Sequence, residues 1–290
     1  MYRLGVWLFG SLAVVHSALA DTMDWFIRDW PPVNILQGPQ QGQGAYDVML
    51  NRLIAALPQY EHQLHISTLT MRQQMMQQQK SHCLFGLLKT PQRQTFLQFS
   101  EPAAAIPNLQ LVARADHPLW RQLQGQTAVD LNWLFGQAWR GMVEQQRTYP
   151  PQITDHLPEL LQVSATDTNL VQMLKAKRAD YVLEYPDRMF YLAQQLPDVE
   201  LKSMPVLGMA AVVEVYVACS INEQAKGQIK AVNQALAQLR HDPQYRAALL
   251  DWLSPASRLL IKNYMAQSPM FDQHFDQTGT AAPAGTVRVR

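Results

Sequence analysis

The feature that most restricts the fold of this chain is a repeated alternation of short apolar runs with segments of helical apolar spacing. Residues 24–30 (DWFIRDW) predict a strand, and residues 46–57 (YDVMLNRLIAAL) place apolar side chains at the period of a helix. A short alternating strand at 64–66 and a polar helix at 70–80 follow. The continuous apolar run at 83–88 (CLFGLL) is typical of a buried parallel strand. This β-α-β-α-β order predicts an α/β fold with a doubly wound sheet.

The alternation recurs in the second half of the chain, which predicts a second α/β unit. The expected strands are 109–112, a short one around Val163, 181–184 and 212–219, and the expected helices are 134–146, 168–177 and 189–195. Helical spacing returns at 229–239, and Asp242-Pro243 supplies an N-cap and a first-turn proline for a last helix. Residues 266–290 lack periodicity and are rich in Gln, Thr, Ala, Pro and Gly, so we expect a disordered tail there.

Residues 1–20 have the pattern of a secretory signal. Arg3 precedes an apolar run at 4–15 (LGVWLFGSLAVV), and Ala18 and Ala20 match a small-residue cleavage site. The run is shorter than the roughly 20 residues of a membrane-spanning helix, although an uncleaved N-terminal anchor is the alternative interpretation. We expect cleavage after Ala20 and a periplasmic location.

Charge and motif content narrow the class of function. Removal of Arg3 with the signal leaves 23 basic and 23 acidic residues, so there is no basic field to attract nucleic acid. The chain has no G-x-S-x-G, no Walker loop, no H-E-x-x-H and no Cys/His metal spacing. We therefore expect no catalytic residue, no metal and no cofactor.

The two cysteines, Cys83 and Cys219, both lie in apolar runs. An even number of cysteines in an exported chain favours a disulfide. A free cysteine also packs well in such a run as a small apolar residue. The free form is the preferred interpretation at this point.

Five short segments carry a resemblance to a known family. They are W-P-P at 30–32, G-A-Y-D-V at 44–48, K-T-P-Q-R at 89–93, F-S-E-P at 99–102 and R-A-D-Y at 178–181. Their order and spacing resemble family 3 of the periplasmic solute-binding proteins, which includes amino-acid-binding components of ABC transporters. The resemblance covers about 25–265, and K-T-P-x-R followed by F-S-E-P is its most specific part.

The resemblance implies a two-lobed periplasmic binding protein fold of type II, in which two doubly wound sheets are joined by two crossing strands and close on ligand by hinge motion. Lobe 1 would comprise 21–106 plus 221–265, and lobe 2 would comprise 107–220. The crossings would lie near 107–114 and 213–219. Cys83 and Cys219 would then fall in different lobes, where a bond would restrain the hinge. We expect a monomer whose partners are a small-molecule ligand and a membrane permease or membrane sensor protein.

Arg93 is the first candidate for ligand binding. Thr90 can cap a short helix that begins at Pro91, and Arg93 would add a two-pronged donor for a carboxylate. In the family that the chain resembles, this arginine grips the ligand carboxylate. The alternative is a surface arginine paired with Glu101 or Asp47.

Three further candidates lie on the same predicted lobe. Trp30 occupies the position where the family places an aromatic ring against the ligand, and its alternative is a core tryptophan. Tyr46, at the start of a predicted helix, is a ligand candidate, whereas Asp47 beside it is interpreted as a helix-start residue. Arg72 could face the cleft or be solvated.

Departures from the family pattern affect the expected ligand. Leu88 replaces the usual Ser or Thr, and Tyr185 occupies the position of the acidic residue that holds an ammonium group. Glu184 lies one position earlier, which turns a strand side chain to the opposite face unless a bulge intervenes. Phe135, with Trp133, would make the lobe 2 wall aromatic. These changes favour a ligand with a carboxylate and a larger apolar part, with a polyamine or a peptide-like molecule as alternatives.

Three hypotheses for function follow. The first is a binding protein that delivers a solute to an ABC-type transporter or a sensor and does no chemistry. The second is a dehydratase-type enzyme on the same fold, with Arg93 orienting a substrate and Glu184 as general acid. The third is a protein-interaction module whose cleft is vestigial.

Overall fold

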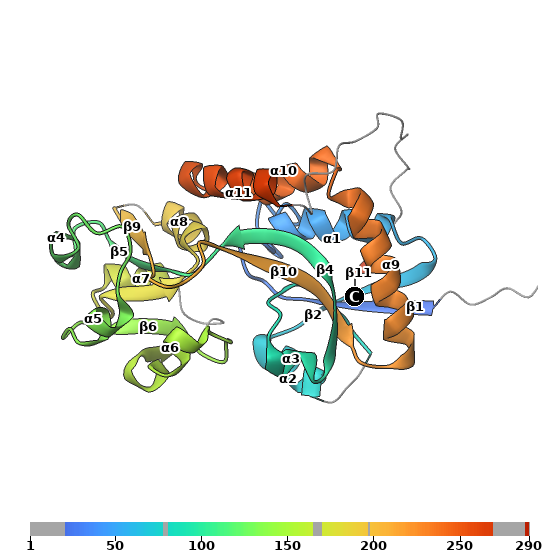
Figure 1. Cartoon of the computed structure of the whole chain (residues 1–290), viewed down its shortest axis with the longest axis horizontal. Helices are drawn as coiled ribbons and strands as arrows, with labels where there is room; N and C mark the ends of the chain where they lie inside the picture. Colours follow the sequence, from blue (N-terminus) through green and yellow to red (C-terminus); the bar gives the residue numbers. More distant parts are fainter. Residues whose placement is uncertain (1–20, 78–80, 165–169, 197, 269–287, 290) are drawn as a thin grey trace, which may run out of the picture.

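Two sheets, each with its own helices, are joined by two long strands in the computed structural model (Figure 1). The structure describes residues 21–77, 81–164, 170–196, 198–268 and 288–289. We call the part built on the first sheet the first lobe and the part built on the second sheet the second lobe. The expected α/β architecture with two crossing strands is confirmed.

The first sheet has the strand order β11-β2-β1-β3-β10-β4. Its strands are β1 (Asp21–Ile27), β2 (Tyr60–Ile66), β3 (Cys83–Leu87), β4 (Leu97–Pro107), β10 (Val212–Ser220) and β11 (Arg288–Val289). β1 pairs in parallel with β2 and β3, whereas β10 is antiparallel to both β3 and β4. The predicted β-α-β-α-β unit therefore forms one half of this sheet, and the crossing strands form the other half.

Helices cover both faces of the first sheet. They are α1 (Ala45–Ala55), α2 (Leu69–Gln77), α3 (Pro91–Gln94), α9 (Glu223–Leu239), α10 (Pro243–Asp251) and α11 (Pro255–Gln267). Successive side chains of a strand point to opposite faces. Trp25 of β1 accordingly belongs to the main core with α1, whereas Phe26 packs in a separate cluster with Leu84 and with Met75 of α2. This alternation fixes the register of the strands between the helices.

The second sheet has the order β7-β6-β8-β5-β9. Its strands are β5 (Gln110–Arg114), β6 (Gly141–Glu144), β7 (Leu161–Val163), β8 (Tyr181–Glu184) and β9 (Leu201–Pro205). Its helices are α4 (Leu119–Gln122), α5 (Leu131–Phe135), α6 (Pro151–Thr154), a 3₁₀ turn (Leu157–Glu159), α7 (Leu170–Lys175) and α8 (Pro186–Gln194). β6 is parallel to β7 and β8, while β5 is antiparallel to β8 and β9.

The chain passes between the lobes along β4 and β10, which Figure 1 shows as long strands reaching from one lobe to the other. Their pairing runs from Pro107 opposite Val212 to Leu97 opposite Ser220. By sheet membership the whole of β10 belongs to the first lobe.

The expectation for the two cysteines is wrong. Cys83 of β3 and Cys219 of β10 are directly opposed in the same sheet and form a disulfide bond. The reason is the course of β10, which does not stop at the lobe boundary but continues between β3 and β4. Because the bond joins neighbouring strands of one lobe, it does not cross the hinge.

The helix expected at 134–146 is also wrong. α5 ends at Phe135, and the chain turns before Gly141 starts the strand β6. All four residues of β6 are buried. Gly141 packs so closely that a Cβ there would lie 2.4 Å from Cζ of Tyr181. The apolar spacing that suggested one helix therefore combines two different elements.

Parts of both ends of the chain lie outside the described residues. The expected signal at 1–20 lies outside the described residues. In the range expected to form a disordered tail, α11 extends to Gln267 and Arg288–Val289 pair with β2, while 269–287 lie outside the description. Within the described ranges, no helix combines the length and apolar character that a membrane crossing requires.

Candidate functional site

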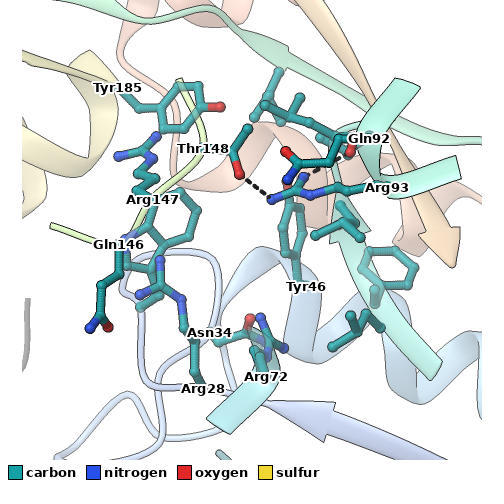
Figure 2. A pocket seen from close by; sticks show the side chains of 18 of the residues that line it. Arg28, Asn34, Tyr46, Arg72, Gln92, Arg93, Gln146, Arg147, Thr148 and Tyr185 are labelled. Atoms are coloured by element: carbon teal, nitrogen blue, oxygen red, sulfur yellow. Dashed lines mark hydrogen bonds between the residues drawn. The ribbon is translucent and has the colours of Figure 1, made fainter. Parts of the chain in front are cut away.

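A pocket of about 360 Å³ lies between the two lobes (Figure 2). It lies where β1, β3, β6 and β8 end, the edge at which parallel α/β sheets commonly bind ligands. Its polar lining residues are Arg28, Asn34, Arg72, Gln92, Arg93, Gln146, Arg147 and Thr148, and its aromatic ones are Trp30, Tyr46, Phe85, Phe96 and Tyr185. Both lobes therefore contribute to one site.

Arg93 reaches the pocket because a capped helical turn positions it. Thr90 is the N-cap of α3, and its side-chain oxygen accepts a hydrogen bond from the Arg93 backbone N–H over 3.3 Å. The guanidinium donates to the carbonyl oxygen of Leu88 at 2.8 Å and to Oγ1 of Thr148 at 3.1 Å (Figure 2). Arg93 is thus held by its own lobe and by the opposite lobe.

Arg72, on α2, enters the same pocket from another element. Its guanidinium donates to the carbonyl oxygen of Phe26, and its buried Nε has no hydrogen-bond partner. Burial, together with the positive charges of Arg28 and Arg93, lowers the pKa of Arg72 to about 9. Burial likewise lowers the pKa of Arg93 to about 10, and the charge of Arg147 adds to this effect. Within the described residues, no carboxylate forms an ion pair with either guanidinium.

The second lobe contributes a buried cluster around Glu184, which is fully buried at the end of β8. Arg147 donates to both carboxylate oxygens at 2.7 and 2.6 Å. The backbone N–H of Tyr185 donates at 2.7 Å, and Arg188 donates at 3.1 Å. A carboxylate has about four lone-pair positions, so Glu184 is saturated.

Glu144, at the end of β6, forms an ion pair across the lobes. Its Oε1 accepts from Arg28 at 2.9 Å, and its Oε2 lies 3.7 Å from Arg147. Burial opposes ionisation, but the charges of Arg147, Arg28 and Arg188 together hold the pKa of Glu144 below its ordinary value. Glu144 therefore neutralises Arg28 across the two lobes.

Trp30 lies against this arginine cluster. The guanidinium carbons of Arg28, Arg147 and Arg188 lie 4.9, 5.2 and 5.3 Å from its ring centroid, within cation–π range. Tyr185 meets the ring edge-on, with centroids 5.7 Å apart. The aromatic surface of Trp30 is thus used by the protein itself, which favours an orienting role for this ring.

The remaining wall of the pocket is apolar and includes Phe85, Phe96, Ile106 and Val215. Tyr46 packs edge-on against Phe85 with ring centroids 5.3 Å apart, and its buried hydroxyl has no hydrogen-bond partner. The pocket thus combines cationic groups with an apolar surface.

Comparison with known proteins identifies the family. The sequence profile of the bacterial extracellular solute-binding proteins, family 3, matches residues 26–255. The chain belongs to this family. No curated protein matches the chain in sequence.

Solved structures of family-like proteins share the fold at low identity. The ligand-binding core of GluR0 from Nostoc punctiforme in complex with L-glutamate is 17% identical, with a TM-score of 0.59 over 80% of this chain and 100% of that one. A Salmonella typhimurium periplasmic binding protein with high arginine specificity is 15% identical, with a TM-score of 0.59 over 81% and 100%. A histidine kinase sensor domain is 18% identical, with a TM-score of 0.59 over 81% and 96%. The expected two-lobed periplasmic binding protein fold is confirmed.

In this family 3 solute-binding protein, most candidates from sequence come together. Five of the predicted residues line the pocket, namely Trp30, Tyr46, Arg72, Arg93 and Tyr185. Thr90 and Glu184 lie behind it, where each holds an arginine. Phe135 is not placed in the pocket, because its ring stacks on His156 with centroids 4.2 Å apart.

Two expectations beside the site are settled by contacts. Asp47 accepts from Gly44 and Ile35 backbone N–H groups and from Asn34, so it acts as a helix-start residue as expected. The Arg93 guanidinium donates to Leu88 and Thr148 and forms no ion pair with Asp47 or Glu101.

Sequence reasoning missed Arg28, Arg147 and Thr148, which line the pocket of this solute-binding protein. Arg28 directly follows β1, so its place at the carboxyl end of a parallel strand was a usable signal. Arg147 and Thr148 follow β6, and the wrongly assigned helix at 134–146 hid the same signal there.

Proposed function

We propose that the protein is exported to the periplasm with cleavage after Ala20 and binds a small carboxylate-bearing solute between its lobes. It holds the solute without chemical turnover and presents it to an ABC-type permease or a membrane sensor. Family membership supports solute binding outside the cytoplasm. Its structural neighbours include a periplasmic binding protein with high arginine specificity and a histidine kinase sensor domain, which supports uptake and sensing as the two uses.

The observation that carries this proposal is the pair Arg72 and Arg93. Among the described residues no carboxylate pairs with either guanidinium, and both have a lowered pKa caused first by burial. A buried cation without a partner is costly, and a guanidinium matches a carboxylate through two parallel hydrogen bonds. A bound carboxylate would supply the missing charge.

The contacts between the lobes support ligand-linked closure. Arg28 pairs with Glu144 across the cleft, and the backbone N–H of Ser254 donates to Asp187 at 2.7 Å. Because β4 and β10 alone carry the chain between the lobes within the described residues, bending of this pair would open the pocket. A solute that contacts both lobes stabilises the closed form.

The surroundings of Glu184 do not favour the enzyme hypothesis. A general acid needs a proton to donate and a path to the substrate. Glu184 is buried and accepts from Arg147, Arg188 and a backbone N–H, so it serves as a structural acceptor and does not line the pocket. Solute binding is the function that this site supports best.

Thermal unfolding of residues 21–290 against amino acids, peptides, polyamines and carboxylates tests the proposal. A ligand present at about 100 times its dissociation constant adds roughly 2.7 kcal/mol of stability. We expect a carboxylate to stabilise the protein and Arg93→Ala to abolish the effect, whereas Arg121→Ala, on the exposed side of α4, leaves it intact. A hit that survives Arg93→Ala places the site elsewhere, and a folded protein without any hit supports the interaction-module hypothesis.

A further inference from the structure

We propose, building on the proposed function, that the pocket selects dicarboxylates with an apolar spacer and discriminates against their α-amino counterparts. The preferred solute has two anionic ends and no ammonium group. This narrows the ligand class from any carboxylate-bearing solute to one defined pattern of charge.

The lining of the pocket is positively charged. Four arginines, Arg28, Arg72, Arg93 and Arg147, line the pocket, and the described lining residues include no Asp or Glu. A ligand ammonium group would therefore meet cations and no carboxylate. Like charges in a poorly solvated site repel strongly.

The two neighbouring carboxylates, Glu184 and Glu144, are fully or almost fully buried and do not line the pocket. Glu184 accepts from Arg147, Arg188 and the Tyr185 N–H, which uses its acceptor capacity. Glu144 pairs with Arg28 through Oε1, whereas its buried Oε2 has no hydrogen-bond partner among the described residues and lies 3.7 Å from Arg147. Because neither carboxylate lines the pocket, the described lining offers a ligand ammonium group no anionic partner.

The four lining arginines differ in whether a nearby carboxylate neutralises them. Pairing Arg28 with Glu144 and Arg147 with Glu184 leaves two lining cations, Arg72 and Arg93, for which the described part of the chain supplies no anionic partner. A single carboxylate would neutralise only one of them. Two unmatched positive charges in one pocket call for a dianion.

Arg72 and Arg93 would bind two carboxylates at two separate positions. Arg93 enters from α3 beside Thr148, whereas Arg72 enters from α2, and Figure 2 shows them approaching from different directions. Arg93 uses only two of its five N–H donors in the hydrogen bonds to Leu88 and Thr148, and the Nε of Arg72 has no partner. Each guanidinium thus retains donors for its own carboxylate.

Apolar side chains complete the lining of the same pocket. Phe85, Phe96, Ile106 and Val215 line it, so the middle of the ligand meets hydrocarbon. The volume of about 360 Å³ lies at the lower end of small-molecule pockets. An unsubstituted carbon spacer suits such a surface better than a hydroxylated one. The apolar surface also favours a ligand with two separate carboxylates over a compact phosphate dianion.

Calorimetric titration of residues 21–290 with matched pairs tests the inference. The pairs are succinate and aspartate, glutarate and glutamate, and adipate and 2-aminoadipate, with hexanoate and inorganic phosphate as single-group probes. We expect at least one dicarboxylate to bind ten times or more tightly than its amino counterpart and than hexanoate.

The outcomes separate this inference from the proposed function. If an amino acid binds as tightly as its matched dicarboxylate, or if phosphate binds most tightly, the inference is overturned while solute binding stands. The same holds if only a monocarboxylate or a solute outside these series binds and depends on Arg93. If nothing binds a folded protein, both fail.

A variant at Arg72 tests the second anion position. Arg72→Met should weaken dicarboxylate binding at least ten times more than it weakens hexanoate binding, because only the dicarboxylate contacts both guanidiniums. Arg121→Met is the matched surface control, and Arg72→Gln, which also removes the charge, replaces Arg72→Met if the latter does not fold. Equal weakening of both ligands by the variant at Arg72 would contradict the inference.

Discussion

The guanidinium of Arg93 in the first lobe donates a hydrogen bond over 3.1 Å to the hydroxyl of Thr148 in the second lobe. The same guanidinium lines the pocket between the lobes. One side chain therefore takes part both in contact between the lobes and in the candidate binding site. Closure and binding are expected to change together when this contact is altered.

Thr148→Val removes the acceptor while keeping the shape of the side chain. A hydrogen bond to a charged group contributes about 1.5–3 kcal/mol, so we expect solute affinity to fall roughly ten- to hundredfold. Titration with the solute found in the thermal screen measures this. Thr154→Val is the control, because Thr154 donates to backbone carbonyl oxygens of Tyr149 and Pro150 away from the pocket. An unchanged dissociation constant for Thr148→Val would show that the contact does not support binding.

Glu184→Ala leaves Arg147 and Arg188 buried without their shared anion. Removing one partner of a buried ion pair costs about 3–5 kcal/mol, and urea unfolding should show a loss of that size. Glu159→Ala is the matched control, since Glu159 is exposed and pairs with His156 at the surface. Its expected loss is about 0–1 kcal/mol. Equal losses for the two variants would contradict the structural role of Glu184.

Acid should weaken the protein partly through Glu144. Its pKa is lowered from 4.5 in the folded protein, so the unfolded chain takes up the proton first. The stabilisation by this group is present above pH 4.5 and is lost as the pH falls through the lowered pKa. Urea unfolding at several pH values should show a smaller acid-induced loss of stability in Glu144→Gln than in the unaltered protein. Parallel curves for the two proteins would assign the acid sensitivity to other groups.

Gly86→Ala should disturb the pocket through Tyr46. Gly86 has φ +80°, and a Cβ there would lie 2.1 Å from the Tyr46 ring. Gly208→Ala is the control, because φ is +77° and no atom lies within 4 Å of the added Cβ. Both variants lose about 1 kcal/mol from the positive φ, and Gly86→Ala should lose a further 1–3 kcal/mol from overpacking. Equal melting temperatures and equal solute affinities for the two variants would rule out the predicted clash.

Loss of the disulfide should lower stability without abolishing the binding site. The bond closes a loop with a sequence separation of 136 residues, and loops of about that length correspond to roughly 4–5 kcal/mol in the chain-entropy account. Thermal unfolding of the Cys83→Ala, Cys219→Ala double variant measures the loss, with Cys83→Ala alone showing the effect of an unpaired thiol. A double variant as stable as the unaltered protein would contradict this prediction.

Local sequence patterns were sufficient to predict several elements of the first lobe. The buried run at 83–88 and the helical spacing at 46–57 correspond closely to β3 and α1. The K-T-P-Q-R segment led to Arg93 because a capped turn is a local structure that a few neighbouring residues specify. These elements depend little on distant parts of the chain.

Long-range pairing was not visible in local patterns. The bond between Cys83 and Cys219 depends on β10 continuing between β3 and β4, which is a matter of strand order. The roles of Arg28 and Arg147 depend on their burial and on two distant glutamates, whereas an arginine beside a strand is usually solvated. The short strand β6 has only four residues, too few for its period to be distinguished from a helix.

The bond between Cys83 and Cys219 has a consequence for the integrity of the folded chain. All strands of the second lobe, from Gln110 to Pro205, lie between these two cysteines in the sequence. A single cut by a protease in any loop of that lobe therefore leaves two fragments that remain covalently joined. Such a nicked protein would migrate as one species on a non-reducing gel and as two on a reducing gel. In a compartment with proteases the second lobe can thus be cut once and still be retained beside the pocket that it helps to form.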